Sequence, residues 1–214
     1  MTAFSPGVLT ITDDEHVESA KRWTQTLHSH GTKASFSLSH QGAALARVVQ
    51  MRPFKDHPEW NRVVTATGTK DPVTGFETHT LTTDEIQDIV EAFGQAARRG
   101  KAAGFDAVRI QGCHAYLIRQ FLSPRTNKRT DEYGGSIEKR ARFACEVILS
   151  TYRVYGHFKH IFRYFFIFFF HCGGKFFFLP HGFQRFLVFL FFLLLLRAAL
   201  EMKQPFRKAH HYHQ

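Results

Sequence analysis

Two side chains that could transfer a proton or donate a hydrogen bond, His114 and Tyr116, stand two residues apart, and Gln111 precedes them. A tyrosine hydroxyl can act as a general acid, and imidazole and amide groups can donate hydrogen bonds. All three follow a short apolar segment, residues 105–110. In parallel α/β barrels the catalytic groups lie at the carboxyl ends of the strands and on the loops that follow. The spacing therefore predicts a catalytic rim, with a structural loop as the alternative.

A thiol nucleophile is a second possibility, because Cys113 directly precedes His114. Adjacent residues at a strand end point to opposite faces, which disfavours a Cys–His pair. The polar run that follows, residues 123–133, could contact a phosphate, or it could form a hydrogen-bonded loop that braces the site. We favour the bracing role. The charged residues concerned are Arg125, Lys128, Arg129 and Asp131. We predict no functional metal site, since the terminal histidines have no carboxylate or Cys partner; they are His210, His211 and His213.

The elements that would position these residues alternate between helix and strand. Thr12 and Glu15 form a capping-box pattern, apolar residues then recur at helical spacing, and Gly31 suits the end of the helix. The apolar stripe consists of Val17, Ala20, Trp23 and Leu27. In KASFSLSH, residues 33–40, apolar residues alternate with serines, which predicts a strand.

The segment from about residue 50 to residue 80 is rich in Pro, Gly and Thr, which predicts a long irregular excursion. A second unit begins after it. Thr82 and Glu85 give another capping box, an apolar stripe follows, and Gly104 ends the helix before the 105–110 strand. Ser136 is the predicted N-cap of a further helix that reaches about residue 155. This rhythm is typical of a parallel α/β sheet or barrel.

A family resemblance is carried by a long run in the middle of the chain, AGFDAVRIQGCHAYLIRQFLSPRTNKRTDEYGGSIEKRARF. It resembles the signature of the old yellow enzyme family, which are FMN-dependent NAD(P)H oxidoreductases on a TIM barrel. The resemblance extends through LTTDEIQDIVEAFGQAARR and HVESAKRWTQTLHSHGTKASFSLSHQG, and covers roughly residues 7–156. It implies an α/β fold, a partial TIM (β/α)8 barrel. We expect the remaining strands to lie outside this chain, which would be a truncated fragment with impaired activity.

The resemblance also implies a reaction. Reduced FMN would pass a hydride to the β-carbon of an α,β-unsaturated carbonyl compound, with NAD(P)H as the hydride donor to the flavin. Two hydrogen-bond donors on the carbonyl oxygen would stabilise the developing enolate by ~3 kcal/mol each. By position, His114 matches one carbonyl-anchoring residue, and Tyr116 matches the tyrosine that protonates the α-carbon.

Three positions depart from the family pattern. The second carbonyl-anchoring position, usually His, is Gln111, which can still donate a hydrogen bond. The family's third strand normally reads QLxHxGR, whereas this chain reads SLSHQGA. Ser37 therefore replaces a flavin-contacting Gln, and Ala43 replaces the Arg. The resemblance assigns Ser37 and His40 to cofactor binding.

The charge and the cysteines exclude some other classes. The net charge is +10, but residues 157–214 hold eight Lys and Arg and one acidic residue, so the rest of the chain carries only +3. We therefore expect no nucleic-acid partner. Three cysteines without CxxC spacing, and an N-terminus without a secretory signal pattern, favour a reducing, cytoplasmic location. The sequence does not select a substrate, NADH over NADPH, or an oligomeric state.

The composition changes abruptly near residue 156. Of the 24 Phe residues, sixteen follow residue 150. Residues 157–214 form a Phe/Leu-rich basic low-complexity tail that is unrelated to the barrel. Because Phe and Leu share pyrimidine-rich codons, we expect this tail to derive from a shifted reading frame or from noncoding sequence. The longest apolar run, residues 186–196, is shorter than the ~20 residues of a membrane-spanning helix. Two alternatives to an enzyme stay open: a non-enzymatic pseudogene-like remnant, and a binding module anchored in a membrane through residues 186–200.

Overall fold

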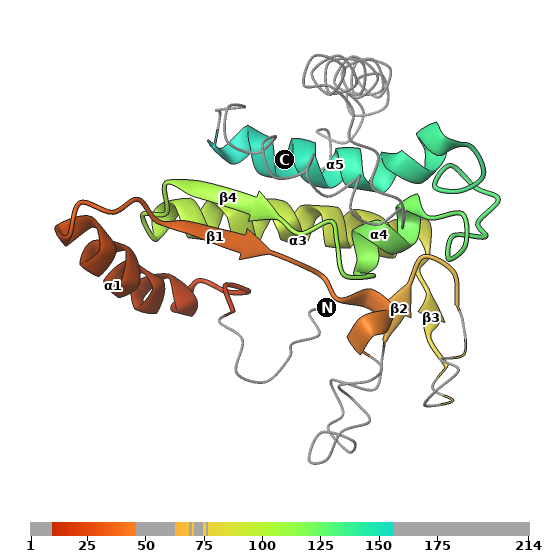
Figure 1. Ribbon diagram of the computed structural model, residues 1–214, viewed down its shortest axis with the longest axis horizontal. Helices are drawn as coiled ribbons and strands as arrows, with labels where there is room; N and C mark the ends of the chain where they lie inside the picture. Colours follow the sequence, from red (N-terminus) through yellow and green to blue (C-terminus); the bar gives the residue numbers. More distant parts are fainter. Residues whose placement is uncertain (1–9, 46–62, 69, 71–74, 76, 156–214) are drawn as a thin grey trace, which may run out of the picture. The chain divides into compact units, whose positions relative to one another are not determined.

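The computed structural model describes residues 10–45, 63–68, 70, 75 and 77–155. Figure 1 shows the elements in chain order. They are α1 (Glu15–Ser29), β1 (Ser35–Leu38), the 3-10 helix η1 (Gly42–Ala44), β2 (Val64–Thr65), β3 (His79–Thr80), α3 (Thr83–Ala102), β4 (Ala107–Ile110), α4 (Leu117–Leu122) and α5 (Ile137–Tyr155). The predicted alternation of helix and strand is confirmed.

Strands β1 and β4 form a parallel pair, visible as two arrows with the same direction in Figure 1. Ser35 lies opposite Ala107, and Leu38 lies opposite Ile110. Parallel neighbours need a crossover connection, and α3 lies in the segment between the two strands. This pair with its helices is the βα unit that the sequence predicts for a barrel.

The excursion predicted for residues of about 50–80 is partly regular where it is described. Strands β2 and β3 pair in parallel, with Val64 opposite His79, and an antiparallel bridge joins Lys70 to Glu77. The excursion therefore contains two short strands that were not predicted, because each has only two residues and leaves no periodic pattern in the sequence.

Helix α1 begins two residues later than its capping-box pattern suggests. Its N-cap is Asp14, without a side-chain cap bond, and the Thr12 hydroxyl donates to the Asp13 carboxylate instead. The helix ends at Gly31 as predicted. The Gly31 N–H donates to His28 O (2.9 Å), and the next N–H donates to Leu27 O (3.1 Å). These are the two bonds of a Schellman motif, and Gly31 has the positive φ (71°) that it requires.

The apolar stripe of α1 is not buried by the described residues. Trp23 is 59% exposed and Leu27 39% exposed, whereas Thr24 is buried. The Thr24 hydroxyl donates to the Ala103 carbonyl (2.5 Å), so a polar contact joins α1 to the end of α3. The prediction of a helix was right, but two residues of its apolar stripe, Trp23 and Leu27, are exposed.

Both ends of α3 match the sequence prediction. Glu85 N–H donates to the Thr82 hydroxyl (3.2 Å), and Thr82 N–H donates to the Glu85 carboxylate (2.8 Å), which completes the capping box. At the other end Gly104 has a φ of 87°, and its N–H donates to Lys101 O (3.0 Å). The predicted apolar stripe is largely buried, with Ile86, Ile89, Phe93 and Ala97 all in the core.

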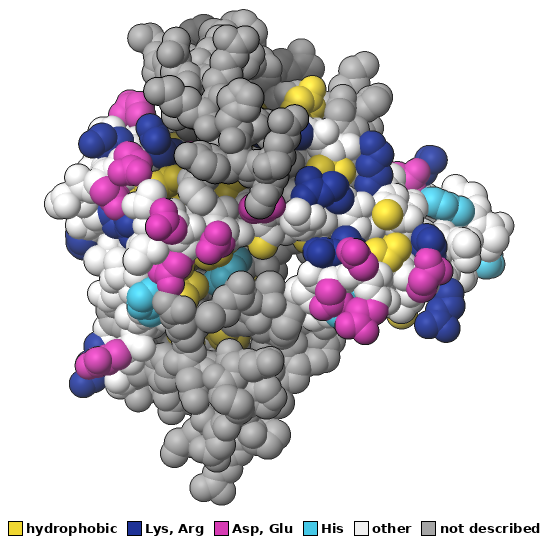
Figure 2. Space-filling view, turned by 180° about the vertical axis from the view of Figure 1, so that it is seen from behind, with side chains coloured by type: hydrophobic (Ala, Val, Ile, Leu, Met, Phe, Trp, Pro, Cys, Tyr) yellow, Lys and Arg dark blue, Asp and Glu magenta, His cyan; other side chains and the backbone are white. Residues whose placement is uncertain are grey.

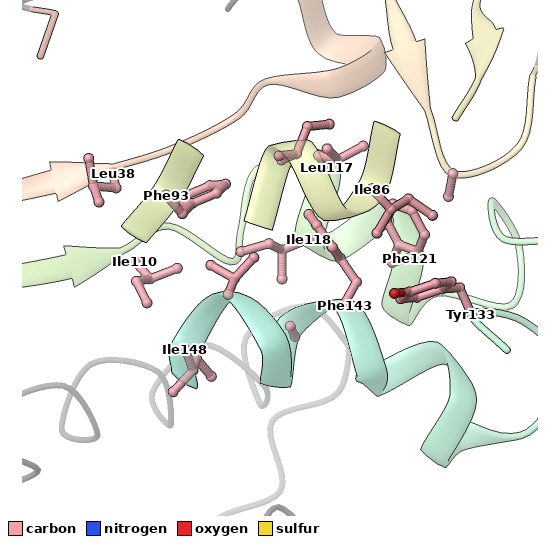
Figure 3. Packing of buried hydrophobic residues seen from close by; sticks show 14 of the residues in the cluster. Leu38, Ile86, Phe93, Ile110, Leu117, Ile118, Phe121, Tyr133, Phe143 and Ile148 are labelled. Atoms are coloured by element: carbon pink, nitrogen blue, oxygen red, sulfur yellow. The ribbon is translucent and has the colours of Figure 1, made fainter. Parts of the chain in front are cut away.

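The core lies where α3, α4 and α5 meet the helix-side face of β1 and β4. Figure 3 shows Phe121 of α4 beside Phe143 of α5 and Tyr133 of the polar run. The Phe121 ring centroid is 4.5 Å from that of Phe143 and 6.1 Å from that of Tyr133. Helix α5 begins after Ser136, whose hydroxyl accepts the Lys139 N–H (3.4 Å), as its predicted cap role requires.

Asp106 ties the amino-terminal ends of the two strands together. Its carboxylate accepts bonds from Lys33 Nζ (2.9 Å), the Ala34 N–H (2.9 Å) and His28 Nε2 (2.7 Å). The Lys33 ammonium and these other donors hold the pKa of Asp106 far below its usual range. The carboxylate thus fastens the end of α1 and the start of β1 to β4.

The described surface carries both charge signs. On the face in Figure 2, Lys and Arg side chains lie among Asp and Glu side chains, and the described residues form no basic stripe there. No helix in the ranges given above combines the length and the apolar character needed to cross a membrane. The predictions made for residues 157–214, among them the membrane segment 186–200 and the terminal histidines, fall outside the described residues.

Candidate active site

The carboxyl ends of β1 and β4 are joined beyond the strands themselves. The Gln111 N–H donates to Leu38 O (2.8 Å), which extends the parallel pairing by one residue. The Leu117 N–H then donates to His40 O (2.9 Å), so the two segments that follow the strands are also joined. Because of these bonds, the predicted site residues Ser37, His40 and Gln111 lie along one edge of the strand pair.

The two faces of the strand pair differ in chemistry. Leu38, Val108 and Ile110 are buried in the core, while Ser37 and Arg109 are exposed on the opposite face. Ser37 lies opposite Arg109 in the register, and Arg109 Nε donates to Ser37 Oγ (3.3 Å). Sequence reasoning missed Arg109, although its alternation with Val108 and Ile110 could have placed it on the same face as Ser37.

His114 and Tyr116 are presented by a tight turn. His114 and Ala115 both have positive φ (56° and 59°), and the Tyr116 N–H donates to Cys113 O (2.9 Å). Two central residues with positive φ are typical of a type I′ turn, and neither is Gly or Asn here. The ring centroids of His114 and Tyr116 are 6.0 Å apart. Such a left-handed conformation in non-glycine residues is a feature of functional sites.

The turn also bears on the thiol alternative. Cys113 is buried and His114 is exposed, so the two side chains diverge as predicted. The cause differs from the one expected, because β4 ends at Ile110 and the divergence comes from the left-handed turn. Cys113 Sγ instead accepts a hydrogen bond from Gln111 Nε2 (2.8 Å), which orients the Gln111 amide.

Gln120 connects the turn to the segment after β1. It is 5% exposed, and its Nε2 donates to Ala115 O (2.6 Å) and to Gln41 O (3.5 Å). Its Oε1 accepts the Ala43 N–H (3.4 Å). Sequence reasoning missed this residue, because a Gln in a short helix is ordinarily a surface residue.

His40 is held in one tautomer. The Gly42 N–H donates to His40 Nδ1 (3.1 Å), so that nitrogen must be unprotonated and the hydrogen of the neutral ring lies on Nε2. Burial lowers the pKa of His40 to about 4, which also makes the ring neutral near pH 7. The Nε2–H group is therefore a hydrogen-bond donor beside the β1–β4 edge.

The polar run after Tyr116 braces the site. The Arg129 guanidinium donates to Ala66 O (2.9 Å), to Leu81 O (2.5 Å) and to the Asp131 carboxylate. These bonds occupy the Arg129 guanidinium. The hydrogen bonds from Arg129 are also the main reason that the pKa of Asp131 is lowered. A brace rather than a phosphate contact is therefore the role that the geometry supports for Arg129.

A partly buried network connects this brace to the helices. Tyr133 OH donates to Glu146 Oε2 (2.9 Å), and Gln87 Nε2 donates to both Tyr133 OH (2.5 Å) and Glu146 Oε2 (3.1 Å). Burial raises the pKa of Glu146. Asn127 is buried as well, and its Nδ2 donates to the Phe121 and Tyr133 carbonyls (both 2.7 Å).

Comparison with known proteins matches this chain to one family. The model of the NADH:flavin oxidoreductase / NADH oxidase family matches residues 3–163. An NADPH dehydrogenase of Bacillus cytotoxicus is 37% identical over 156 residues, which are 69% of this chain and 39% of the relative. An NADPH dehydrogenase of Halalkalibacterium halodurans is 38% identical over 144 residues, 67% of this chain and 39% of the relative.

Solved structures agree with this match. Morphinone reductase in complex with tetrahydroNAD is 35% identical, with a TM-score of 0.59 over 68% of this chain and 42% of the other. The old yellow enzyme homologue from Zymomonas mobilis is 29% identical, with a TM-score of 0.58 over 68% of this chain and 41% of the other. This chain spans about two fifths of the length of these proteins. The βα unit is thus part of an α/β barrel, and the chain belongs to the NADH:flavin oxidoreductase / NADH oxidase family.

Proposed function

We propose that this protein is an FMN-dependent NAD(P)H oxidoreductase that reduces activated alkenes, namely α,β-unsaturated carbonyl compounds. Family membership supports the oxidoreductase class. One observation carries the proposal further: His114 and Tyr116, with ring centroids 6.0 Å apart, stand on a left-handed turn beside the joined ends of two parallel strands. That is where barrel enzymes carry their catalytic groups.

The residues at this edge fit the polar side of a flavin ring. The Ser37 hydroxyl, the Arg109 guanidinium and the His40 Nε2–H can all donate hydrogen bonds to ring carbonyl and nitrogen acceptors. Ser37 and Arg109 share one exposed face. When bound, FMN supplies the hydride chemistry, with NAD(P)H as the source of electrons. We propose Ser37 and His40 as its contacts in this part of the chain.

The chain's own residues would act on the substrate. His114 and the Gln111 amide would donate hydrogen bonds to the carbonyl oxygen, where each donor could contribute roughly 3 kcal/mol as negative charge develops. Gln111 has a second amide hydrogen besides the one directed at Cys113 Sγ. Tyr116 would act as the acid, donating its hydroxyl proton to the α-carbon.

We retain the division of the chain as a further proposal. Residues 1–156 would form the barrel part and residues 157–214 an unrelated Phe/Leu-rich tail. The family match ends at residue 163, near the proposed boundary. The non-enzymatic remnant and the membrane-anchored module are not favoured, because a family of oxidoreductases matches most of the chain.

The test separates the two halves of the reaction. The full chain would be saturated with FMN, and the visible absorption of the bound flavin would be followed. The first step is anaerobic reduction of the flavin with NADPH or NADH, and the second is its reoxidation by an α,β-unsaturated ketone. Tyr116→Phe should leave flavin reduction unchanged and slow reoxidation by 10²–10⁴-fold, the usual contribution of a general acid. Tyr152→Phe in α5, the same chemical change elsewhere, is the control. Failure to bind FMN, or equal reoxidation rates in both variants, would overturn the proposal.

A further inference from the structure

The left-handed turn at His114 and Ala115 needs an external contact to hold it. Positive φ is unfavourable for residues that carry a Cβ atom, and two such residues follow one another here. The internal turn bond, from the Tyr116 N–H to Cys113 O, is a single hydrogen bond. A side chain that bonds to the backbone of the turn from outside could therefore decide how fully the turn is populated.

Gln120 makes such a contact from α4. Its Nε2 donates to the carbonyl oxygen of Ala115 at 2.6 Å, inside the turn itself. The other end of the amide accepts the Ala43 N–H, so the turn is connected to the segment after β1. The orientation of the amide follows from chemistry, because a flipped amide would place Oε1 against two carbonyl oxygens.

The segment after β1 is shaped to receive this amide. A Cβ atom added at Gly42 would lie 2.6 Å from Gln120 Oε1 and 2.7 Å from Nε2, and Gly42 also has a φ of 56°. Only glycine therefore suits this position without displacing the amide. Gln120 and Gly42 therefore form a fitted pair.

We propose that Gln120 is a positioning residue, which holds the His114–Ala115 turn in its left-handed conformation and so sets the places of His114 and Tyr116. The proposal rests on the proposed function for the roles of His114 and Tyr116, and on the hydrogen bonds above for the mechanism. An apolar residue of similar volume would fill the same space but would leave the Ala115 carbonyl without this donor.

The test is amide hydrogen exchange at Tyr116 in the full chain, which reports on the turn bond and requires neither flavin nor turnover. In Gln120→Glu the acceptor for the Ala43 N–H remains and both Nε2 donors are lost. We expect exchange at Tyr116 to accelerate on the order of tenfold, the effect of one lost hydrogen bond to the turn. Gln120→Leu, which loses all three side-chain bonds, should accelerate it at least as much.

The matched control is Asn127→Asp. Asn127 is another buried amide that donates to two carbonyls, but it lies in the brace, and both of those carbonyls, of Phe121 and Tyr133, lie outside the turn. Far-UV circular dichroism would confirm that each variant keeps its helices. If a Gln120 variant unfolds, exchange is instead compared in the wild type and in Asn127→Asp and Gly42→Ala, the last of which displaces the amide without removing it.

Rescue by glycine completes the test. Ala115→Gly removes the steric cost of the left-handed conformation at the centre of the turn. In the Gln120→Glu background it should restore most of the protection at Tyr116, and in the wild type it should slow exchange further by a similar factor. Unchanged exchange in Gln120→Glu, equal acceleration in Asn127→Asp, or no rescue by Ala115→Gly would each overturn the proposal. Failure of FMN binding would bear on the proposed function alone.

Discussion

Gly134 and Gly135 are adjacent but should respond very differently to replacement by alanine. A Cβ atom added at Gly134 would lie 2.5 Å from the Arg129 Cβ and closer still to the Arg129 carbonyl carbon and oxygen. At Gly135 the same atom would meet nothing within 4 Å, although the φ of 83° is unfavourable for alanine. We predict that Gly134→Ala destabilises the fold far more than Gly135→Ala.

The magnitude follows from what holds the Arg129 backbone. Ordinary contact begins at 3.4 Å, so this backbone would have to move by about 1 Å or more. Its N–H donates to Asn127 Oδ1 (3.1 Å), and its guanidinium bonds to the Ala66 and Leu81 carbonyls. Such a movement would stretch these bonds beyond their useful range. At about 1–1.5 kcal/mol for each of three bonds, the cost is about 3–4.5 kcal/mol.

Gly135→Ala should cost only about 1–2 kcal/mol, the penalty of positive φ for a residue with a Cβ atom. The two variants have the same composition and nearly the same unfolded chain, so their difference reports on the folded state. Equilibrium unfolding in urea, followed by far-UV circular dichroism, measures both free energies of unfolding. If Gly134→Ala costs no more than Gly135→Ala, the polar run does not brace the site as described.

Three further predictions concern caps and buried or paired carboxylates. Thr82→Ala removes the side-chain half of the α3 capping box and should lower the free energy of unfolding by about 1 kcal/mol in urea titrations. The folded-state pKa of Asp106 is lowered, so the carboxylate contributes to the free energy of unfolding above the ordinary Asp pKa, and this contribution is lost on acidification. Asp106→Asn should therefore lose less stability than the wild type when the pH falls below about 4. The folded-state pKa of Glu146 is raised, so the wild type should lose stability as the pH rises above 4.5, and Glu146→Gln should flatten that dependence in thermal melts.

Helix ends were the most predictable features, because their signals are local. The capping box at Thr82 and the Schellman end at Gly104 depend on residues within one turn of the helix, and both are present in the structure. The Thr12 pattern shows the limit of this reasoning. The same spacing failed there because the helix starts after Asp14, and a pattern of two residues does not exclude a later start.

Burial was predictable only where the partner surface is also in the described chain. The stripe of α3 packs against α5 and both strands, and its residues are buried. The stripe of α1 has the same periodicity, yet Trp23 and Leu27 remain exposed. Periodicity identifies a face that is apolar, but what covers that face depends on residues far away in the sequence.

The candidate site was likewise predictable only in part. The positions of Gln111, His114 and Tyr116 after a strand could be predicted from spacing, and the β1–β4 register brings Ser37 and His40 to the same edge. The left-handed turn could not be predicted, since turns of this type are dominated by Gly, Asn and Asp, and His-Ala contains none of them. Gln120 was also missed, because its hydrogen bonds connect segments that lie far apart in the sequence, Gln41–Ala43 and Ala115.

The energetics of the turn explain why such a distant residue should matter. Positive φ at His114 and Ala115 costs roughly 1–2 kcal/mol each, or about 2–4 kcal/mol together. The turn bond and the bond from Gln120 to Ala115 O contribute about 0.5–1.5 kcal/mol each, and the tie to Ala43 adds a similar amount. These sums are of similar size, so the turn depends on the bonds that Gln120 makes. Since about 1.4 kcal/mol is a tenfold change in an equilibrium constant, loss of one hydrogen bond from Gln120 should raise the open fraction of the turn on the order of tenfold.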